Sequence, residues 1–213
     1  MIIAIDGPSG SGKSTTAKGV AESLGFIYLD TGAMYRAVTY GLIDAKINLN
    51  DNKKVCKFLE EISITFDLSN NLILNGNNVS GEIRKNSITS KVSKISSLPE
   101  VRKTMVDMQR EISNNVNCVI EGRDIGTVVF PQAECKFFLT ADKAVRAKRR
   151  MIEFEKIGEK VSYNEVLKGL EKRDEQDSSR IHSPLKKAED AIQIDTSYLT
   201  IDQQIKLIVD KIK

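Results

Sequence analysis

Three glycines, a lysine and several hydroxyl residues lie close together near the N-terminus, in the stretch GPSGSGKST. Gly7, Gly12, Lys13 and Ser14 fit the pattern G-x-x-x-x-G-K-[ST], between a short apolar run and an apolar helical pattern. Glycines let backbone N–H groups approach a polyphosphate, and the following helix adds its positive dipole end. Lys13 would reach the β- and γ-phosphates, and the Ser14 hydroxyl would bind Mg²⁺. The stretch predicts a nucleoside triphosphate site, with a plain glycine-rich turn as the alternative.

A second group of polar residues follows the apolar run at 118–120, where Glu121, Arg123 and Asp124 occur together. An acid beside a base suits a site that handles a second anionic substrate as well as a metal. The base-reading Asn-Lys-x-Asp element of GTPases is missing, because the nearest string, NKKV at 52–55, lacks the aspartate. A motor ATPase would normally be longer. These residues therefore argue against a GTPase switch and a motor ATPase.

Arginines form a third group. Arg146, Arg149 and Arg150 recur at helical spacing, and Lys143 extends the same face. Like charges at this spacing repel by a few tenths of a kcal/mol per pair on an isolated helix, so they make sense if the face closes on phosphates. A solvated basic face is the alternative.

Further along, Arg173, Asp177 and Arg180 also share one helical face. Salt bridges within the helix would explain that pattern without a ligand, and this alternative stays open. Arg36 follows the turn at 30–32, which comes directly after another apolar run.

The apolar pattern predicts the elements that must position these residues. Short apolar runs at 2–5, 26–29, 118–120, 136–139 and 191–194 alternate with helical periodicity, which is typical of a buried parallel sheet covered by helices. Helices are expected after the glycine loop, ending at Gly25, from Pro99 onward, and after a capping box at Thr200 and Gln203. Residues 45–97 contain strands joined by Asn/Gly turns, which suggests an insertion. Residues 143–180 are charged and helical, with few large apolar residues to bury, which suggests a mobile lid, or alternatively a solvated helix pair.

Composition limits the class of protein. The 213 residues are 40% hydrophobic and 29% charged, so we expect a soluble globular protein, either one large domain or a core carrying one or two insertions. The net charge of +3 is mild and gives little reason to expect binding of nucleic acid. We expect no membrane span, no secretory leader and a cytoplasmic location. The three cysteines are too widely spaced for a metal or disulfide framework. The single histidine, His182, is not expected to act as a catalytic base.

With these residues established, the chain resembles bacterial cytidylate kinases, in the P-loop nucleoside monophosphate kinase group. The resemblance spans nearly the whole chain and is carried by these stretches: IAIDGPSGSGKST, LDTGAMYRA, VSGEIR, GRDIGTVVFP, FLTADKAVRAKRR and KRDEQDSSR. It implies an α/β, three-layer P-loop kinase fold with a five-stranded parallel sheet, a helical lid and an NMP-binding insertion containing a small antiparallel sheet. The implied boundaries are core 1–34, insertion 35–97, core 98–145, lid 146–180 and core 181–213.

The implied reaction moves the γ-phosphate of ATP to CMP or dCMP, with Mg²⁺ held by Ser14. Residues assigned to ATP are Gly7, Pro8, Ser9, Gly10, Ser11, Gly12, Lys13, Ser14, Thr15, Arg146 and Arg150. Those assigned to the acceptor are Thr31, Tyr35, Arg36, Ser93, Arg102, Arg123, Asp124, Arg173, Asp177 and Arg180. Those assigned to catalysis are Lys13, Arg123, Asp124 and Arg180.

Within the acceptor set, the resemblance gives each residue a part. Ser93, Arg102 and Asp124 would recognise cytosine; Arg36, Arg123 and Arg180 would bind the CMP phosphate; Arg173 and Asp177 would hold the sugar. Thr31 replaces a serine frequent in the family and keeps the hydroxyl, and Glu121 replaces the aspartate of some members. Chemistry agrees with the base assignment, because a carboxylate accepts from the cytosine N4 amine but would face a carbonyl of uracil.

Two other functions remain open from the sequence. One is a P-loop kinase for another small acceptor, such as adenylate, guanylate or a metabolite. The other is a regulatory nucleotide-binding module that uses the basic stretch to bind nucleic acid, although the paired arginines and aspartates would then be superfluous. We expect a monomer, because no long heptad run is present.

Overall fold

The computed structural model describes residues 1–67, 69–156 and 158–212. The chain divides into two compact units, which are described separately. The large unit comprises residues 1–29 and 113–213, and the small unit comprises residues 30–112. None of the helices in the described residues is long and apolar enough to cross a membrane.

The described residues form a five-stranded sheet in the order β2-β6-β1-β7-β8. Its strands are β1 (Ile2–Asp6), β2 (Ile27–Asp30), β6 (Cys118–Gly122), β7 (Cys135–Thr140) and β8 (Ile192–Asp195). β1 pairs in parallel with both β6 and β7, and β7 pairs in parallel with β8. All five strands and the parallel sheet predicted from the apolar runs are confirmed. Because Asp6 pairs with Gly122, β1 and β6 end together, and the segments that follow them start at one edge.

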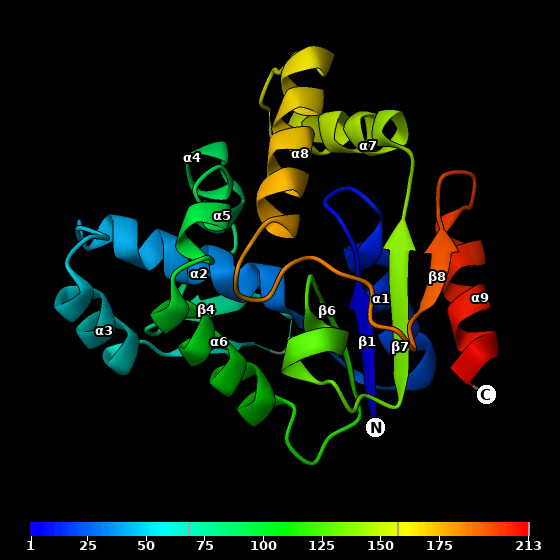
Figure 1. The fold of residues 1–213 in the computed structure, drawn as a ribbon, viewed down its shortest axis with the longest axis horizontal. Coiled ribbons are helices and arrows are strands. Elements are labelled where there is room, and N and C mark those ends of the chain that lie inside the picture. Colours follow the sequence, from blue (N-terminus) through cyan, green and yellow to red (C-terminus); the bar gives the residue numbers. More distant parts are fainter. Residues whose placement is uncertain (68, 157, 213) are drawn as a thin grey trace. The chain divides into compact units, whose positions relative to one another are not determined.

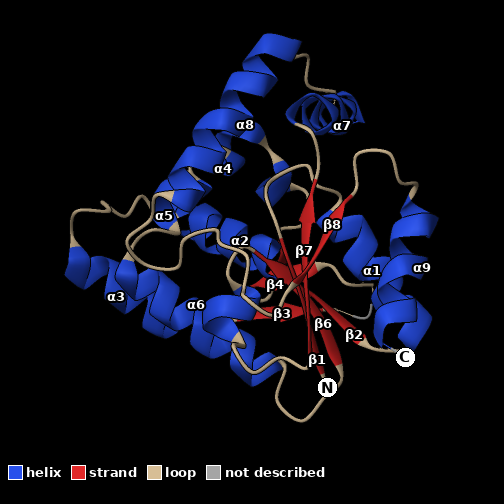
Figure 2. Cartoon of the chain, turned by 45° about the vertical axis from the view of Figure 1, so that its right-hand side comes forward, coloured by secondary structure: helices blue, strands red, loops and turns tan. Residues whose placement is uncertain are grey.

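Two helices cover one face of the sheet: α1 (Lys13–Leu24) and α9 (Ile201–Ile212) lie side by side in Figures 1 and 2. Between them and the strands, apolar side chains such as Ile5, Val20 and Ile208 form a fully buried core. Gly25 ends α1 with φ 67°, as predicted. The predicted capping box of α9 is also present, because Thr200 N–H donates to Gln203 and Gln203 N–H donates back to Thr200 Oγ1.

The charged segment after β7 folds into α7 (Lys143–Lys156) and α8 (Tyr163–Ser178), which pack against each other beyond the end of β7 (Figure 1). The sequence suggested that this segment has few large apolar residues to bury. The structure nevertheless contains a small apolar cluster there, in which Phe154 of α7 lies with Val166 and Leu170 of α8. This cluster gives the helix pair a core of its own.

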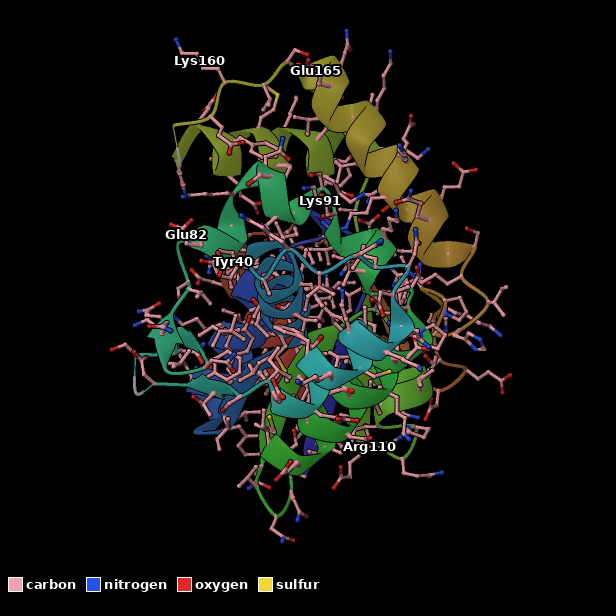
Figure 3. All side chains as sticks on the ribbon, turned by 90° about the vertical axis from the view of Figure 1, so that its left-hand side faces the viewer. Tyr40, Glu82, Lys91, Arg110, Lys160 and Glu165 are labelled. Atoms are coloured by element: carbon pink, nitrogen blue, oxygen red, sulfur yellow. The ribbon has the colours of Figure 1, made fainter. Side chains whose placement is uncertain are left out.

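A capping box starts α8. The Ser162 hydroxyl accepts from Glu165 N–H, and the Glu165 carboxylate accepts from Ser162 N–H at 2.9 Å. Figure 3 labels Glu165 at this helix start and the exposed Lys160 in the loop before it. We expect Ser162→Ala to destabilise α8 by about 1 kcal/mol. Amide hydrogen exchange would detect this as faster exchange in the first turns of α8, with Lys160→Ala as the unchanged control.

The small unit contains a three-stranded antiparallel sheet in its described residues, made of β3 (Ile64–Phe66), β4 (Leu72–Leu74) and β5 (Asn77–Asn78). Its helical elements are α2 (Thr31–Asp44), α3 (Asn52–Glu61), η1 (Glu82–Arg84), α4 (Asn86–Thr89), α5 (Val92–Ile95) and α6 (Pro99–Ile112). Figure 3 labels Tyr40 on α2 and Arg110 on α6 within this unit. The antiparallel strands predicted within 45–97 and the helix predicted from Pro99 are confirmed.

Candidate functional site

The glycine loop connects β1 to α1 and turns tightly on itself. The Lys13 Nζ donates to the Pro8 carbonyl at 3.0 Å, so the lysine side chain folds back over the loop. A Cβ atom at Gly7 would lie 2.1 Å from the Leu139 carbonyl oxygen of β7, which leaves no room for any side chain. Gly12, with φ 88°, directly precedes α1, and no side chain caps the start of the helix. The uncapped N–H donors and the helix dipole suit phosphate oxygens.

Lys13 is only 6% exposed, and its charge depends on its surroundings. The pKa of Lys13 is lowered to about 7, chiefly by burial and in addition by Arg123 and Arg173. Glu121 and Asp6 act in the opposite direction and raise it. Polyphosphate beside Lys13 would likewise favour the ammonium form, because an opposite charge stabilises it. The loop and the arginines of the large unit therefore belong to one electrostatic site.

Two arginines of α7 donate hydrogen bonds to backbone carbonyls of the glycine loop. Arg146 is 4% exposed and donates to the Ser9 carbonyl at 3.1 Å and to Asp174 of α8 at 2.6 Å. Arg149 donates to the Gly10 carbonyl at 3.4 Å and to the Thr196 carbonyl at 2.7 Å. The helix pair is thus tied directly to the loop and to the segment after β8.

Arg150, the other α7 residue predicted for ATP, has different partners. Its guanidinium donates to Glu153 at 2.6 Å and lies 4.5 Å from the centre of the Phe154 ring. Arg149 was noted in the sequence only as part of a basic face. Its contacts, and those of Asp174 and Thr196, needed the tertiary structure, because each partner is remote in sequence.

A cluster of arginines surrounds one buried carboxylate. Asp177 is 2% exposed and accepts from Arg123 Nε at 3.0 Å and from Arg180 at 2.5 Å, with Arg173 Nε at 3.9 Å. Burial alone would raise the pKa of Asp177, but the three guanidinium groups outweigh it and lower the pKa. Salt bridges within the 173–180 segment, the alternative left open by the sequence, are present. Arg123 joins them from a segment 54 residues away, so the cluster is more than a helical pattern.

Two acidic residues, one near the end of β6 and one just after it, are both buried. Glu121 is 3% exposed and accepts from the Tyr28 hydroxyl at 2.6 Å, which links β6 to β2. Asp124 is 3% exposed and lies close enough to Asp6 to raise the pKa of that residue. The sequence indicated neither the tyrosine partner nor the proximity of Asp6.

The remaining predicted residues lie in the small unit. Asp30 caps α2 by accepting from Ala33 N–H at 2.8 Å and also accepts from Arg36 at 3.0 Å. The guanidinium of Arg102 lies 5.4 Å from the centre of the Tyr35 ring. Thr31, Ser93, Tyr35 and Arg102 are all buried. The predicted acceptor residues Tyr35 and Arg102 are therefore neighbours.

The donor set fits a magnesium ion that arrives with a nucleotide. Ser14 is exposed in the first turn of α1. Across the described ranges, no group of three or more His, Cys, Asp and Glu side chains could hold a metal ion. Mg²⁺ usually keeps several waters and binds substrate phosphates with few protein oxygens, so one hydroxyl beside a phosphate loop is sufficient.

Comparisons with known proteins agree on one family. A family model described as cytidylate kinase matches residues 3–213. A curated cytidylate kinase from Fusobacterium nucleatum subsp. nucleatum is 48% identical over 213 residues, covering 100% of this chain and 97% of that protein. A curated cytidylate kinase from Cytophaga hutchinsonii is 46% identical, covering 99% of this chain and 92% of that protein.

Among solved structures, an uncharacterized protein from Eubacterium ventriosum ATCC 27560 superposes with a TM-score of 0.52 at 17% identity. The match covers 100% of this chain and 98% of that one. At this identity, the likeness concerns the fold alone.

Proposed function

The chain belongs to the cytidylate kinase family, and we propose that it transfers the γ-phosphoryl group of ATP to CMP or dCMP, giving ADP with CDP or dCDP. The observation that carries the proposal is the proximity of a phosphate loop and an arginine cluster within the large unit. After burial, Arg123 is the strongest influence that lowers the pKa of Lys13, and Arg123 also donates to Asp177. Donor and acceptor phosphates would bind beside each other there.

On the ATP side, the loop backbone and the start of α1 would hold the phosphates, and Lys13 would neutralise the β- and γ-phosphates. Arg146 supports this assignment because it already contacts the loop at Ser9. Arg150 would reach ATP only by leaving Glu153 and Phe154; Glu153 is exposed and Arg150 is half-buried. Mg²⁺ bound with ATP would neutralise charge that develops on the phosphates.

On the acceptor side, Arg123 and Arg180 would bind the CMP phosphate together with Arg36, because planar guanidinium groups bind two oxygens at once. Arg173 and Asp177 would hold the sugar. Asp124, with Arg102 and Ser93, would recognise cytosine. The burial of all three residues supports this last assignment, since a buried polar group left unpaired by the wrong base rejects it strongly.

The transfer needs no general base in this proposal. A nucleotide monophosphate has a second pKa of about 6, so its attacking oxygen is already mostly deprotonated at neutral pH. The exposed position of His182 supports the same view. The chain's own contribution would be to align the two phosphates, neutralise their charge with Lys13 and the arginines, and exclude water beneath α7 and α8.

We also propose that the protein acts in the cytoplasm as a monomer, with nucleotides and no nucleic acid as its partners. Light scattering after size-exclusion chromatography tests the monomer: a single species of one chain is expected.

An acceptor panel tests the function. ADP release from Mg·ATP is measured with CMP, dCMP, UMP, AMP or GMP, and with no acceptor. We expect turnover with CMP and dCMP and little without an acceptor. Best turnover with another acceptor would keep the phosphoryl transfer and overturn the assignment of Asp124 and Arg102.

The same panel also tests the alternative that the protein is a regulatory nucleotide-binding module. Folded protein that shows no acceptor-dependent turnover, but binds DNA or RNA with an affinity that falls as salt rises, would replace the kinase proposal.

A further inference from the structure

A buried carboxylate that is not among the predicted site residues connects the phosphate loop with the segment that carries Arg123 and Asp124. Asp6 is the last residue of β1 and is followed directly by Gly7 of the phosphate loop. Its side chain is 4% exposed. It crosses to the segment after β6, where its two carboxylate oxygens accept from Ile125 N–H at 2.9 Å and Gly126 N–H at 2.8 Å.

The two amides belong to the first turn of a short π-helix, η2 (Ile125–Val129), which starts immediately after Arg123 and Asp124. The first N–H groups of any helix have no partner within the helix. Here both residues are buried, so without Asp6 each donor would be left unsatisfied at a substantial cost. Asp6 therefore fixes the backbone just beyond the residues assigned to the acceptor.

The close fit around Gly126 supports the same interpretation. A Cβ atom there would lie 3.2 Å from Lys136 Cδ and 3.5 Å from Asp6 Oδ2. A methyl group there would touch the carboxylate at ordinary van der Waals distance and would crowd only the side chain of Lys136. The backbone of Gly126 therefore lies directly against Asp6, as its hydrogen bond to that carboxylate requires.

The ionisation of Asp6 has a cost. The pKa of Asp6 is raised to about 6, and burial is the largest cause. Asp124 also raises this pKa, whereas the amides of Gly126 and Ile125 and the charge of Lys13 lower it. Because the folded pKa is above the ordinary value of 3.8, the contribution of this group to stability is complete below that value and is lost as pH rises through about 6. A charged group kept at such a cost is typical of a functional site.

We propose that Asp6 is a positioning residue for the phosphoryl transfer: its carboxylate holds Ile125 and Gly126, and thereby aligns Arg123 and Asp124 with the phosphate loop that starts at Gly7. The inference rests on the proposed function. Asp6 touches neither substrate; it acts through the backbone of its two partners. A displacement of the order of 1 Å in such an alignment lowers turnover by about a hundredfold.

A kinetic experiment on Asp6→Asn tests the alignment. An amide offers one acceptor and must present its NH₂ group to the second backbone N–H, so we expect kcat to fall by about 10- to 100-fold. The KM for ATP should change by less than about threefold, because the phosphate loop itself is intact. The control is Glu134→Gln, at the opposite end of β1, where the exposed Glu134 accepts from Ile2 N–H at 2.7 Å. It should retain turnover within about twofold.

A second variant keeps the test decisive if Asp6→Asn does not fold. Asp6→Ser is smaller than aspartate, so it fits the buried position, but its single hydroxyl can accept from at most one of the two amides. We expect a loss of kcat similar to that of Asp6→Asn. Ile208→Val, in the core beneath α9, controls for a general loss of stability. Wild-type kcat in a folded Asp6→Asn, or in Asp6→Ser when only that variant folds, would overturn the inference.

Amide NMR of the ligand-free protein gives a readout that does not depend on activity. In a His182→Gln background, which removes the histidine, the Ile125 and Gly126 amides should shift with a midpoint near the Asp6 pKa of about 6. Asp6→Asn should abolish that step. Amides that do not titrate in the His182→Gln background would overturn the contact itself. A wild type without kinase activity, combined with the expected titration, would overturn only the proposed kinase function.

Discussion

Replacing Lys13 with alanine is expected to lower kcat by about a thousandfold while the protein remains folded. Lys13 is the positive side chain that folds over the phosphate loop, and Arg123 and Arg173 both act on it electrostatically. Its loss removes charge that neutralises the transferred phosphoryl group in the transition state. Because burial already disfavours the ammonium form, its removal should not lower stability greatly.

The measurement is acceptor-dependent ADP release at saturating Mg·ATP and CMP, together with the thermal unfolding midpoint. The control is Lys18→Ala on the same helix, where the lysine is exposed and forms only a 3.9 Å pair with Glu22. That variant should keep wild-type turnover, because exposed pairs contribute little. A folded Lys13→Ala protein with near-normal kcat would remove the phosphate-loop mechanism.

Replacing Asp124 with alanine is expected to reduce the preference for CMP over UMP by about a hundredfold in kcat/KM. The physical reason is that a buried carboxylate can accept a hydrogen bond from the amine of cytosine but would face a carbonyl of uracil, which leaves both oxygens unpaired. Removing Asp124 abolishes that penalty, so the two acceptors become more alike. ATP binding should change less, because the phosphate loop is unaltered.

The selectivity is measured as the ratio of kcat/KM for CMP and UMP, with KM for ATP determined on the same protein. Asp202→Ala is a suitable control, because Asp202 is exposed in the first turn of α9. It should leave the ratio unchanged. An Asp124→Ala enzyme that is folded and still strongly prefers CMP would show that other residues recognise the base.

Much of the fold was predictable because its signals are local. The glycine loop, the five apolar strands, the ends of α1 and the capping box of α9 each depend on residues within a few positions of one another. Such patterns follow from helix and strand periodicity and from backbone hydrogen bonding at helix ends. The family resemblance added the residue assignments, which stay predictions until the variants are measured.

The contacts that build the site could not be predicted, because the partners are distant in sequence. Arg123 meets Asp177 across 54 residues, Tyr28 meets Glu121 across 93, and Asp6 meets Gly126 across 120. No periodicity connects such pairs. The apolar cluster of α7 and α8 was also underestimated, because its members are dispersed among charged residues on two helices.

By itself, the sequence determined which residue types are present and which helices and strands carry them. Only the tertiary structure decided which charges face one another, since parallel strand register brings the ends of β1 and β6 together. That register places Asp6 beside the backbone after Asp124, and the packing of α7 and α8 places arginines against the phosphate loop. Hydrogen bonds and charges act over a few ångströms, so their pairing is fixed by the fold and not by distance along the chain.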